Sequence, residues 1–354
     1  MLALTKAEPG RDGCLASSGA LFALIWLFAA ALGPLPAAAG TASAPVAASV
    51  FGPDARTWLQ RIHSAARQRN YQGTLVVSAD GQMSSSRMVH FCEGSQCFER
   101  IDMLDGQPQR VYRHNEQVLT LWPAAKVARV EQRDAVALFP AVLSGSEDQL
   151  FERYDMIAEG ADRIAGLDAA VFLLRPRDAH RFAQRLWADQ GSGLLLRADV
   201  LSADGRVLET AAFTEVTIGI KALPESVTTP MKKLDGYRVV RATPQRTGLE
   251  AEGWRLKVPV AGFKHVSCIK RKLEAAGEAD AALSAEVLQT IFSDGLTHVS
   301  VFVEPLRADR HRAGSGAFGA THTLMQPLGA FWVTVVGDVP MATLRQFADA
   351  LVRR

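Results

Sequence analysis

The sequence predicts a mainly β (α+β) protein with two domains: a large curled antiparallel sheet with helices, and a smaller sheet-and-helix domain after it. Three observations predict this fold. Short segments that alternate between polar and apolar residues recur between residues 70 and 221, separated by turn residues such as Asp-Gly. Strands and helices do not alternate along the chain, which argues against a parallel nucleotide-binding sheet. A proline-containing stretch, residues 222–247, then separates the first domain (50–221) from the second (248–354).

The composition is that of an ordinary globular protein. The chain has 354 residues, of which 48% are hydrophobic and 21% charged, with a net charge of +2. This length suffices for two independent cores and the four cysteines are too few for a disulfide-built scaffold. No basic run is present, so nucleic acid is not expected as a partner. From residue 228 onward there are 17 Lys and Arg against 12 Asp and Glu, so the second domain is the basic part.

The N-terminus predicts export. Residues 20–32 form an uncharged apolar run that is followed by small residues, which is the arrangement of a secretory signal (1–39) cleaved after Ala39. At about 1.5 Å per residue the run spans roughly 20 Å, which is short of the ~30 Å hydrocarbon core of a membrane. A permanent membrane span is the alternative interpretation.

The elements of the first domain follow from their periodicity. Residues 54–68 predict an amphipathic helix that Asp54 caps. Residues 134–152 carry a second helical pattern, which Pro140 interrupts. Strands are expected at 71–78, 86–91, 98–104, 109–113, 117–122, 126–132, 169–176, 181–189, 193–202 and 206–220.

The second domain shows the same two kinds of periodicity over fewer residues. Strands are expected at 254–260, at 265–273, on both sides of a Ser-Asp-Gly turn at 293–295, and at 331–339. The chain is expected to end in a helix, residues 341–352, whose apolar stripe contains Leu344, Phe347, Ala348 and Leu351.

Several strands of the first domain are apolar on both faces. Residues 194–196 are three consecutive leucines and residues 171–174 are also all apolar, whereas a strand covered on one side only alternates cleanly. Helices across the sheet would cover the second face, and so would a cavity for an apolar ligand. The candidate cavity residues are Trp58, Leu75, Val77, Trp122, Phe139, Trp187, Leu194 and Leu196.

Cys92 and Cys97 face each other across an expected hairpin. Side chains at opposed positions of paired strands are close enough for a disulfide, which is the pairing we expect. A metal site with His90 lacks a local fourth ligand, and two free thiols are the remaining alternative. Cys268 has no obvious partner and is expected to be buried.

No motif points to catalysis. Residues 314–319, GSGAFG, match the dinucleotide fingerprint formally, but no strand leads into them and no helix follows, so a loop is expected. The chain has no nucleophile-elbow serine and no zinc-type histidine spacing. We therefore expect no enzyme activity, no cofactor and no metal.

The chain resembles the MucB/RseB family, which regulates the sigma-E (AlgU-type) envelope stress response. The resemblance lies in YQGTLVV, FERIDMLDGQPQRVYR and LWADQGSGLLLRADVLSADGRVLE in the first domain. The second domain contributes GWRLKVPVAGF, IFSDGLTHVSVFVE and VTVVGDVPMATLRQFADALV.

This resemblance implies a first domain similar to lipoprotein carriers, an unclosed antiparallel β-barrel with helices across its mouth. It also implies a periplasmic protein that binds the periplasmic segment of a membrane anti-sigma factor, protects that segment from proteolysis and releases it when lipid or another acylated ligand signals stress. A periplasmic lipid or lipoprotein carrier is the alternative function, and homo-oligomer formation stays open. The candidate partner-binding residues are Lys257, Lys264, Arg271 and Lys272.

Overall fold

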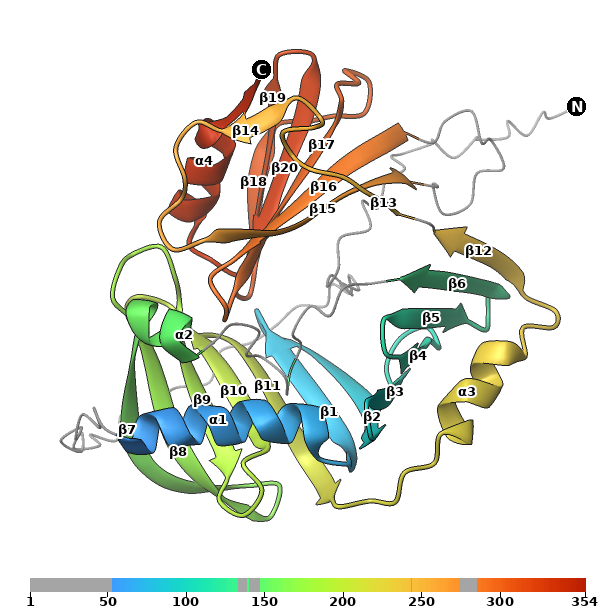
Figure 1. Ribbon diagram of the computed structural model, residues 1–354, viewed down its shortest axis with the longest axis vertical. Coiled ribbons are helices and arrows are strands. Elements are labelled where there is room, and N and C mark those ends of the chain that lie inside the picture. Colours follow the sequence, from blue (N-terminus) through green and yellow to red (C-terminus); the bar gives the residue numbers. More distant parts are fainter. Residues whose placement is uncertain (1–52, 133–138, 140–146, 243, 274–284) are drawn as a thin grey trace, which may run out of the picture.

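The structure, a computed structural model, describes residues 53–132, 139, 147–242, 244–273 and 285–354 (Figure 1). The expected signal, residues 1–39, and most of the expected helix at 134–152 lie outside the described residues. The described chain forms one large and one small β-sheet with few helices, so the predicted mainly β, two-domain fold is confirmed.

The first domain is built on a 12-stranded sheet that does not close. Its strand order is β12-β6-β5-β4-β3-β2-β1-β11-β10-β9-β8-β7, so β7 and β12 are its free edges. Neighbouring strands are antiparallel except for β12 and β6. The strands are β1 (Tyr71–Ala79), β2 (Gln82–Glu93), β3 (Gln96–Met103), β4 (Arg110–His114), β5 (Gln117–Trp122), β6 (Val127–Gln132), β7 (Tyr154–Ile164), β8 (Leu167–Pro176), β9 (Ala183–Asp189), β10 (Leu195–Leu201), β11 (Val207–Ile218) and β12 (Arg238–Ala242).

Helix α1 (Pro53–Gln68) lies across the concave face of this sheet (Figure 1). It begins one residue earlier than expected, with a proline whose fixed φ suits the first helical position. Leu59 and Ile62 are each 1% exposed and pack against β8, β9 and β10, together with the short helix α2 (Glu147–Arg153). No helix in the described ranges is long and apolar enough to cross a membrane.

The segment expected to join the domains, residues 222–247, is largely ordered against the first domain. It contains helix α3 (Glu225–Lys232), whose Val227 is fully buried in a cluster with Phe91 and Phe98. Strand β12 then pairs in parallel with β6 and extends the large sheet.

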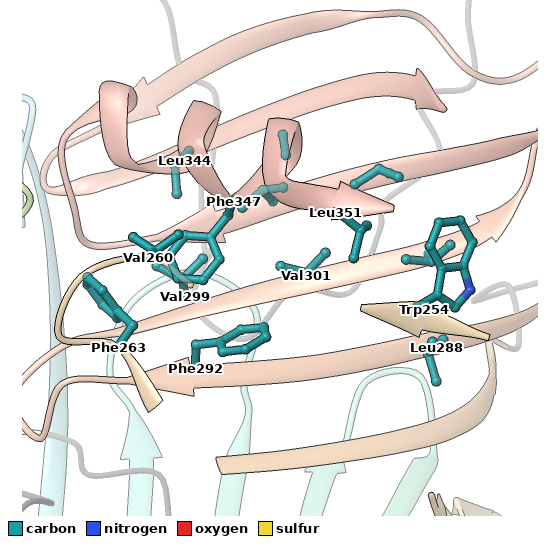
Figure 2. Close-up of a cluster of buried hydrophobic side chains, with 14 of the residues drawn as sticks. Trp254, Val260, Phe263, Leu288, Phe292, Val299, Val301, Leu344, Phe347 and Leu351 are labelled. Atoms are coloured by element: carbon teal, nitrogen blue, oxygen red, sulfur yellow. The ribbon is translucent and has the colours of Figure 1, made fainter. Parts of the chain in front are cut away.

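The second domain is a 7-stranded sheet covered by one helix. Its strand order is β13-β15-β16-β17-β20-β19-β18, and a two-stranded sheet joins β14 to β21. Helix α4 (Met341–Ala350) lies over the sheet, with Leu344 and Phe347 fully buried in the core (Figure 2). The strands are β13 (Gln245–Arg246), β14 (Trp254–Leu256), β15 (Lys264–Leu273), β16 (Ala285–Ser293), β17 (His298–Pro305), β18 (Gly314–Phe318), β19 (Thr321–Leu328), β20 (Phe331–Gly337) and β21 (Leu351–Arg353).

Several elements of the second domain differ from the sequence-based expectation. The strand expected at 254–260 ends at Leu256, and β19 was not expected. The last helix ends at Ala350, and Leu351 begins β21, where it pairs with Leu256. The glycine-rich residues expected to form a loop are instead edge strand β18, which pairs with β19. Glycine weakens a strand but does not forbid one, and the hydrogen bonds to β19 hold this segment in place.

Candidate functional site

The two domains meet at a turn of the second domain that inserts into the first. This turn follows β16, and its Leu296 is only 8% exposed. Leu296 belongs to the same buried cluster as Leu59 and Ile62 of α1. Asp294 Oδ1 accepts backbone hydrogen bonds from Leu296 (2.9 Å) and Thr297 (2.8 Å), which fixes the turn. The core of the first domain is therefore completed by a residue of the second.

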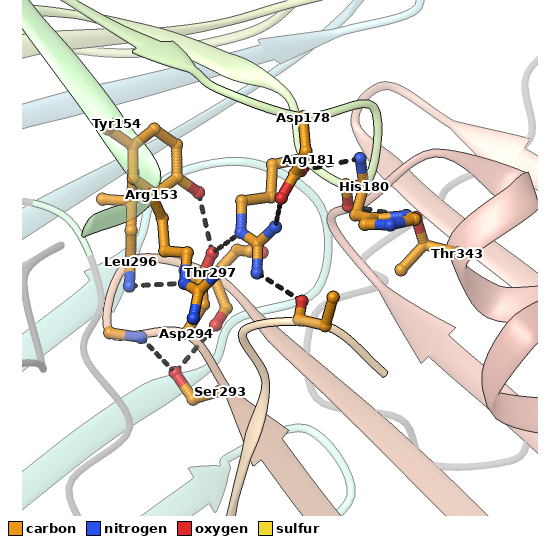
Figure 3. A network of polar contacts seen from close by, with 12 residues as sticks. Arg153, Tyr154, Asp178, His180, Arg181, Ser293, Asp294, Leu296, Thr297 and Thr343 are labelled. Carbon is orange, nitrogen blue, oxygen red and sulfur yellow. Dashed lines mark hydrogen bonds and ion pairs between the residues drawn. The ribbon is translucent and has the colours of Figure 1, made fainter. Parts of the chain in front are cut away.

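A buried ion pair lies beside this turn (Figure 3). Arg181 Nε, from the first domain, donates to Asp294 Oδ2 at 2.6 Å, and both side chains have 0% exposure. The Tyr154 hydroxyl donates to the same oxygen at 2.8 Å. Charge-assisted hydrogen bonds in a buried setting are strong, and they are costly to leave half made.

The two terminal nitrogens of Arg181 also have partners. Its Nη1 lies 2.5 Å from Asp178 Oδ2, its Nη2 donates to the Ala261 carbonyl at 2.8 Å, and its guanidinium lies 4.7 Å from the centre of the Phe263 ring. Gly262 makes this approach possible, because a Cβ there would lie 2.1 Å from Arg181 Nη2. Arg181 therefore binds the second domain through both the Asp294 turn and the 261–263 segment.

Burial and the Asp294 carboxylate raise the pKa of Tyr154 well above its ordinary value. Tyr154 therefore keeps its proton at physiological pH and acts as a hydrogen-bond donor in the junction. The start of α4 also docks here, since Thr343 Oγ1 donates to the His180 carbonyl at 3.0 Å.

A second contact between the domains lies at the turn between β18 and β19. The Gly319 amide donates to Asp80 Oδ2 at 2.7 Å, and Phe182 packs edge-on against His322 with ring centres 5.6 Å apart. Gly319 has φ +57°, and a Cβ there would lie 2.7 Å from the Cβ of Ala79. The glycine-rich segment therefore serves as a docking element between the domains.

Two carboxylates come close at this second contact. Burial and the nearby carboxylate of Asp338 raise the pKa of Glu209 to about 7, although a hydrogen bond from the Ala320 backbone opposes the shift. Glu209 belongs to β11 of the first domain and Asp338 follows β20 of the second. Ionisation of Glu209 near neutral pH therefore places two like charges across the junction.

The structure brings together four of the eight residues expected to line a lipid cavity. Trp58 and Phe139 pack against the cluster under α1, and Leu75, Leu194 and Phe139 join the adjoining cluster around Tyr71. Trp58 lies 5.1 Å from Phe172, measured between ring centres. These four residues share the sheet face that α1 covers.

The other four expected residues are not members of these two clusters. Trp187 and Leu196 pack with Ala169 and Val171 in a separate cluster. Because Phe172 of the same strand contacts the α1 cluster, this second cluster belongs to the opposite sheet face. The centre of the Trp122 ring lies 5.7 Å from the guanidinium carbon of Arg129. Val77 and Trp122 are both partly buried.

Two surface hollows of about 440 and 270 Å³ lie on the first domain. The larger is bordered by Asp168 and Gln190, and the smaller by Arg87 and Asp102. Neither is lined by any of the eight expected lipid-binding residues. Leu59 and Ile62 of α1 pack against the apolar face that was expected to hold a ligand.

The expected partner-binding residues divide into two sets. Lys257 and Lys264 are exposed near Val258 and Val266, which are 62% and 59% exposed, so this segment presents charge and apolar surface together. The partly buried Arg271 has its guanidinium 5.8 Å from the centre of the Phe302 ring. The side chain of Lys272 lies outside the described part of the structure.

A disulfide joins Cys92 and Cys97, with Cα atoms 4.1 Å apart at opposed positions of β2 and β3. The third described cysteine, Cys268, is buried, and burial raises the pKa of its thiol to about 11. It is therefore an unreactive core residue.

The sequence did not identify the junction residues Tyr154, Arg181, Asp294 and Leu296. The only local signal for them in the sequence was the Ser-Asp-Gly motif at 293–295, which predicted the turn but not the burial of Asp294. An isolated Asp or Arg in a sequence is expected to lie at the solvent-exposed surface. Only the fold shows that this pair is buried between the two domains.

Comparison with known proteins gives a consistent result. The sequence model of the MucB/RseB N-terminal domain matches residues 54–232, and that of the MucB/RseB C-terminal domain matches residues 248–352. The sigma factor AlgU regulatory protein MucB of Pseudomonas aeruginosa is 29% identical over 307 residues, covering 83% of this chain and 90% of MucB. The sigma-E factor regulatory protein RseB of Haemophilus influenzae is 24% identical over 299 residues, covering 83% of this chain and 90% of RseB.

Solved structures agree with these relatives. A crystal structure of MucB in complex with MucA(peri) has a TM-score of 0.64 and 27% identity, and covers 85% of this chain and 99% of that chain. A crystal structure of MucB has a TM-score of 0.61 and 26% identity, with coverage of 86% and 99%. The similarity therefore includes both domains.

Proposed function

The chain belongs to the MucB/RseB family, and on this premise we propose that it is a periplasmic sigma-factor regulatory protein whose two domains together hold the periplasmic segment of a membrane anti-sigma factor. In this function the bound segment is shielded from proteases, and a lipid-like signal releases it. The observation that carries the proposal is the similarity, across both domains, to a MucB that was solved with MucA(peri).

The junction supports a function that needs both domains. The Arg181–Asp294 pair and the insertion of Leu296 give the two domains a specific relative arrangement. A lipoprotein carrier would need only the first domain, whereas the relatives named as regulatory proteins are covered over about nine tenths of their length. The regulator is therefore favoured over the carrier.

We assign partner binding to the exposed segment around Lys257 and Lys264. Two lysines beside the exposed valines Val258 and Val266 suit a segment that carries both acidic and apolar residues. Mixed surfaces of this kind guide association through charge and retain the partner through apolar contact.

We assign lipid sensing to the sheet face that α1 covers, including Trp58, Leu75, Phe139 and Leu194. Because Leu59 and Ile62 of α1 pack against this face, we expect an acyl chain that binds there to move the helix. Burying a dozen methylenes is worth roughly 10 kcal/mol at ~0.8 kcal/mol each. Shifting an equilibrium from 1:99 to 99:1 needs only about 5.5 kcal/mol of differential binding. A lipid that favours the released arrangement by about half of this gross energy would therefore shift the equilibrium far enough to release the partner.

A binding experiment with the exported chain tests the partner. The affinity for the periplasmic segment of the anti-sigma factor is measured by calorimetry for the native chain and for the double variant Lys257→Glu/Lys264→Glu. We expect a roughly tenfold loss at low salt and a smaller loss at high salt. The matched control is Lys232→Glu/Lys233→Glu at the end of α3, which reverses two exposed charges of the segment between the domains and should leave the affinity unchanged. Equal losses in both variants would rule out a specific site.

The same assay tests the lipid. Adding an acylated lipid should weaken partner binding and change the fluorescence of Trp58, which a Trp58→Phe variant identifies as the source. A lipid that binds without weakening partner binding would support a carrier instead.

A further inference from the structure

The end of the β2–β3 hairpin brings three metal-ligating side chains together. His90, Cys92 and Cys97 each place a ligand atom within 4.8 Å of the others. His90 and Cys92 are two positions apart on β2 and so share a sheet face, and the register sets Cys97 directly opposite Cys92. His90 and Cys92 lie on the same face of β2 as Met88, next to the end of α1, where Cys92 Sγ lies 3.0 Å from the Arg67 carbonyl oxygen.

His90 is held in the orientation that a metal ligand requires. The residue is only 5% exposed, and its ring stacks on that of Tyr71 with centres 5.0 Å apart. Its Nδ1 donates to Glu99 Oε1 at 3.0 Å, which leaves the lone pair on Nε2. Nε2 lies 3.5 Å from Cys92 Sγ. A carboxylate that orients a histidine from behind is the usual second-layer partner of a zinc-bound imidazole.

Two asparagine side chains hold the backbone of the cysteines in place through contacts that do not involve sulfur. The Cys92 amide donates to Asn70 Oδ1 at 2.9 Å, and the Cys97 amide donates to Asn115 Oδ1 at 3.0 Å. The disulfide itself closes a ring of only six residues, for which chain entropy gives about 2 kcal/mol. We therefore expect the hairpin to stay folded when the disulfide is reduced.

We propose that Cys92, Cys97 and His90 form a redox-controlled site for a thiophilic divalent cation such as Zn²⁺. The site does not bind the cation while the two cysteines form a disulfide, and it binds the cation after a thiol or phosphine has reduced them. Reduction adds two electrons and two protons to the disulfide. Two thiol molecules supply them and become a disulfide, or a phosphine supplies the electrons and water supplies the protons and the oxygen of the phosphine oxide. Binding of Zn²⁺ then displaces the two thiol protons, so that two thiolates and the neutral imidazole hold the ion. Water completes the fourth position, as in other zinc sites with two cysteines and one histidine.

Cobalt binding tests the site, because Co²⁺ bound by thiolates gives charge-transfer absorption that unbound Co²⁺ lacks. The exported full-length chain is used with the buried Cys268 replaced, Cys268→Ser, and is titrated with Co²⁺ in its oxidised form and after phosphine reduction. We expect one equivalent of Co²⁺ per reduced chain, displaced by Zn²⁺, and no thiolate band from the oxidised chain. Circular dichroism of each form confirms that the chain is folded.

Substitutions that keep both cysteines identify the histidine and its partner. Glu99→Gln should weaken Zn²⁺ binding by about 10- to 100-fold, since it removes the carboxylate that orients His90. His90→Gln should weaken binding further and shift the cobalt spectrum. Glu116→Gln changes an exposed carboxylate in the β4–β5 turn and should leave the affinity unchanged. A folded, reduced chain without a thiolate band, or a metal affinity that His90→Gln leaves unchanged, would overturn the proposal.

Discussion

Tyr154 and Asp294 are 140 positions apart in the sequence, yet the Tyr154 hydroxyl donates a 2.8 Å hydrogen bond to Asp294 Oδ2 inside the junction of the two domains. Tyr154 is 1% exposed and Asp294 is 4% exposed. The bond runs from the first strand after α2 to the turn that carries Leu296 into the first core. It therefore couples the packing of the first domain to the position of the second.

The first prediction concerns the buried charge pair. Asp294→Ala leaves the Arg181 guanidinium buried without its main counter-charge, so we expect the free energy of unfolding to fall by about 3–5 kcal/mol. Urea denaturation followed by tryptophan fluorescence measures this change. Asp309→Ala is the control, because the Asp309 side chain is 76% exposed and its ion pair with Arg310 is superficial. Equal stability of the two variants would show that the junction contributes little.

The second prediction concerns Gly262, which has φ +80°. Gly262→Ala places a Cβ 2.1 Å from Arg181 Nη2, so the 261–263 segment must move away from the arginine. Gly253 has the same φ of +80° but no neighbour within 4 Å of an added Cβ. Gly253→Ala should therefore cost only the backbone strain, about 1–2 kcal/mol. We expect Gly262→Ala to lower the melting temperature clearly more than Gly253→Ala.

The third prediction tests the inserted leucine. Leu296→Ala removes buried methyl groups from the cluster around α1, and we expect a loss of about 2–4 kcal/mol in the free energy of unfolding. The variant should also become more sensitive to limited proteolysis near the junction. Leu306→Ala is the comparison, since Leu306 is 37% exposed and its truncation leaves a smaller cavity. Similar losses for the two leucines would argue against insertion.

The fourth prediction concerns pH. The pKa of Glu209 is about 7 in the folded chain, above its ordinary value of about 4.5, so the protonated form is favoured by folding. Its contribution to stability is therefore full below pH ~4.5 and is lost as the pH rises through ~7. Glu209→Gln should stabilise the chain at pH 8 by up to about 3 kcal/mol and have little effect at pH 4.

Thermal denaturation of Glu209→Gln and of native chain between pH 4 and pH 8 measures this difference. Glu116→Gln, at an exposed position, serves as the control and should follow the native profile. Because Glu209 faces the β18–β19 turn, the same titration should loosen the second contact between the domains, which small-angle scattering detects as an increase in the radius of gyration. If the stability of Glu209→Gln depends on pH in the same way as that of the native chain, the Glu209 carboxylate is not the source of the pH dependence.

The sequence by itself determined most of the elements and their order, but it predicted no strand at β7 or β19 and no helix at α3. Alternation of apolar residues identified most strands because a half-buried strand repeats every two residues, and the stripe of Leu344 and Phe347 identified α4 because a helix repeats every 3.6. Asp-Gly pairs located turns such as that at Asp80 and Gly81, where both residues have positive φ. These signals are local, so they can be read without the fold.

Only the tertiary structure decided which residues meet. The three leucines at 194–196 go to three different clusters, because Leu194 precedes β10 while Leu195 and Leu196 are successive strand residues that point to opposite sheet faces. The glycine-rich segment becomes a strand because β19 pairs with it. Arg181 and Asp294, 113 positions apart, form the junction because their burial depends on both domains at once, and no local pattern encodes that condition.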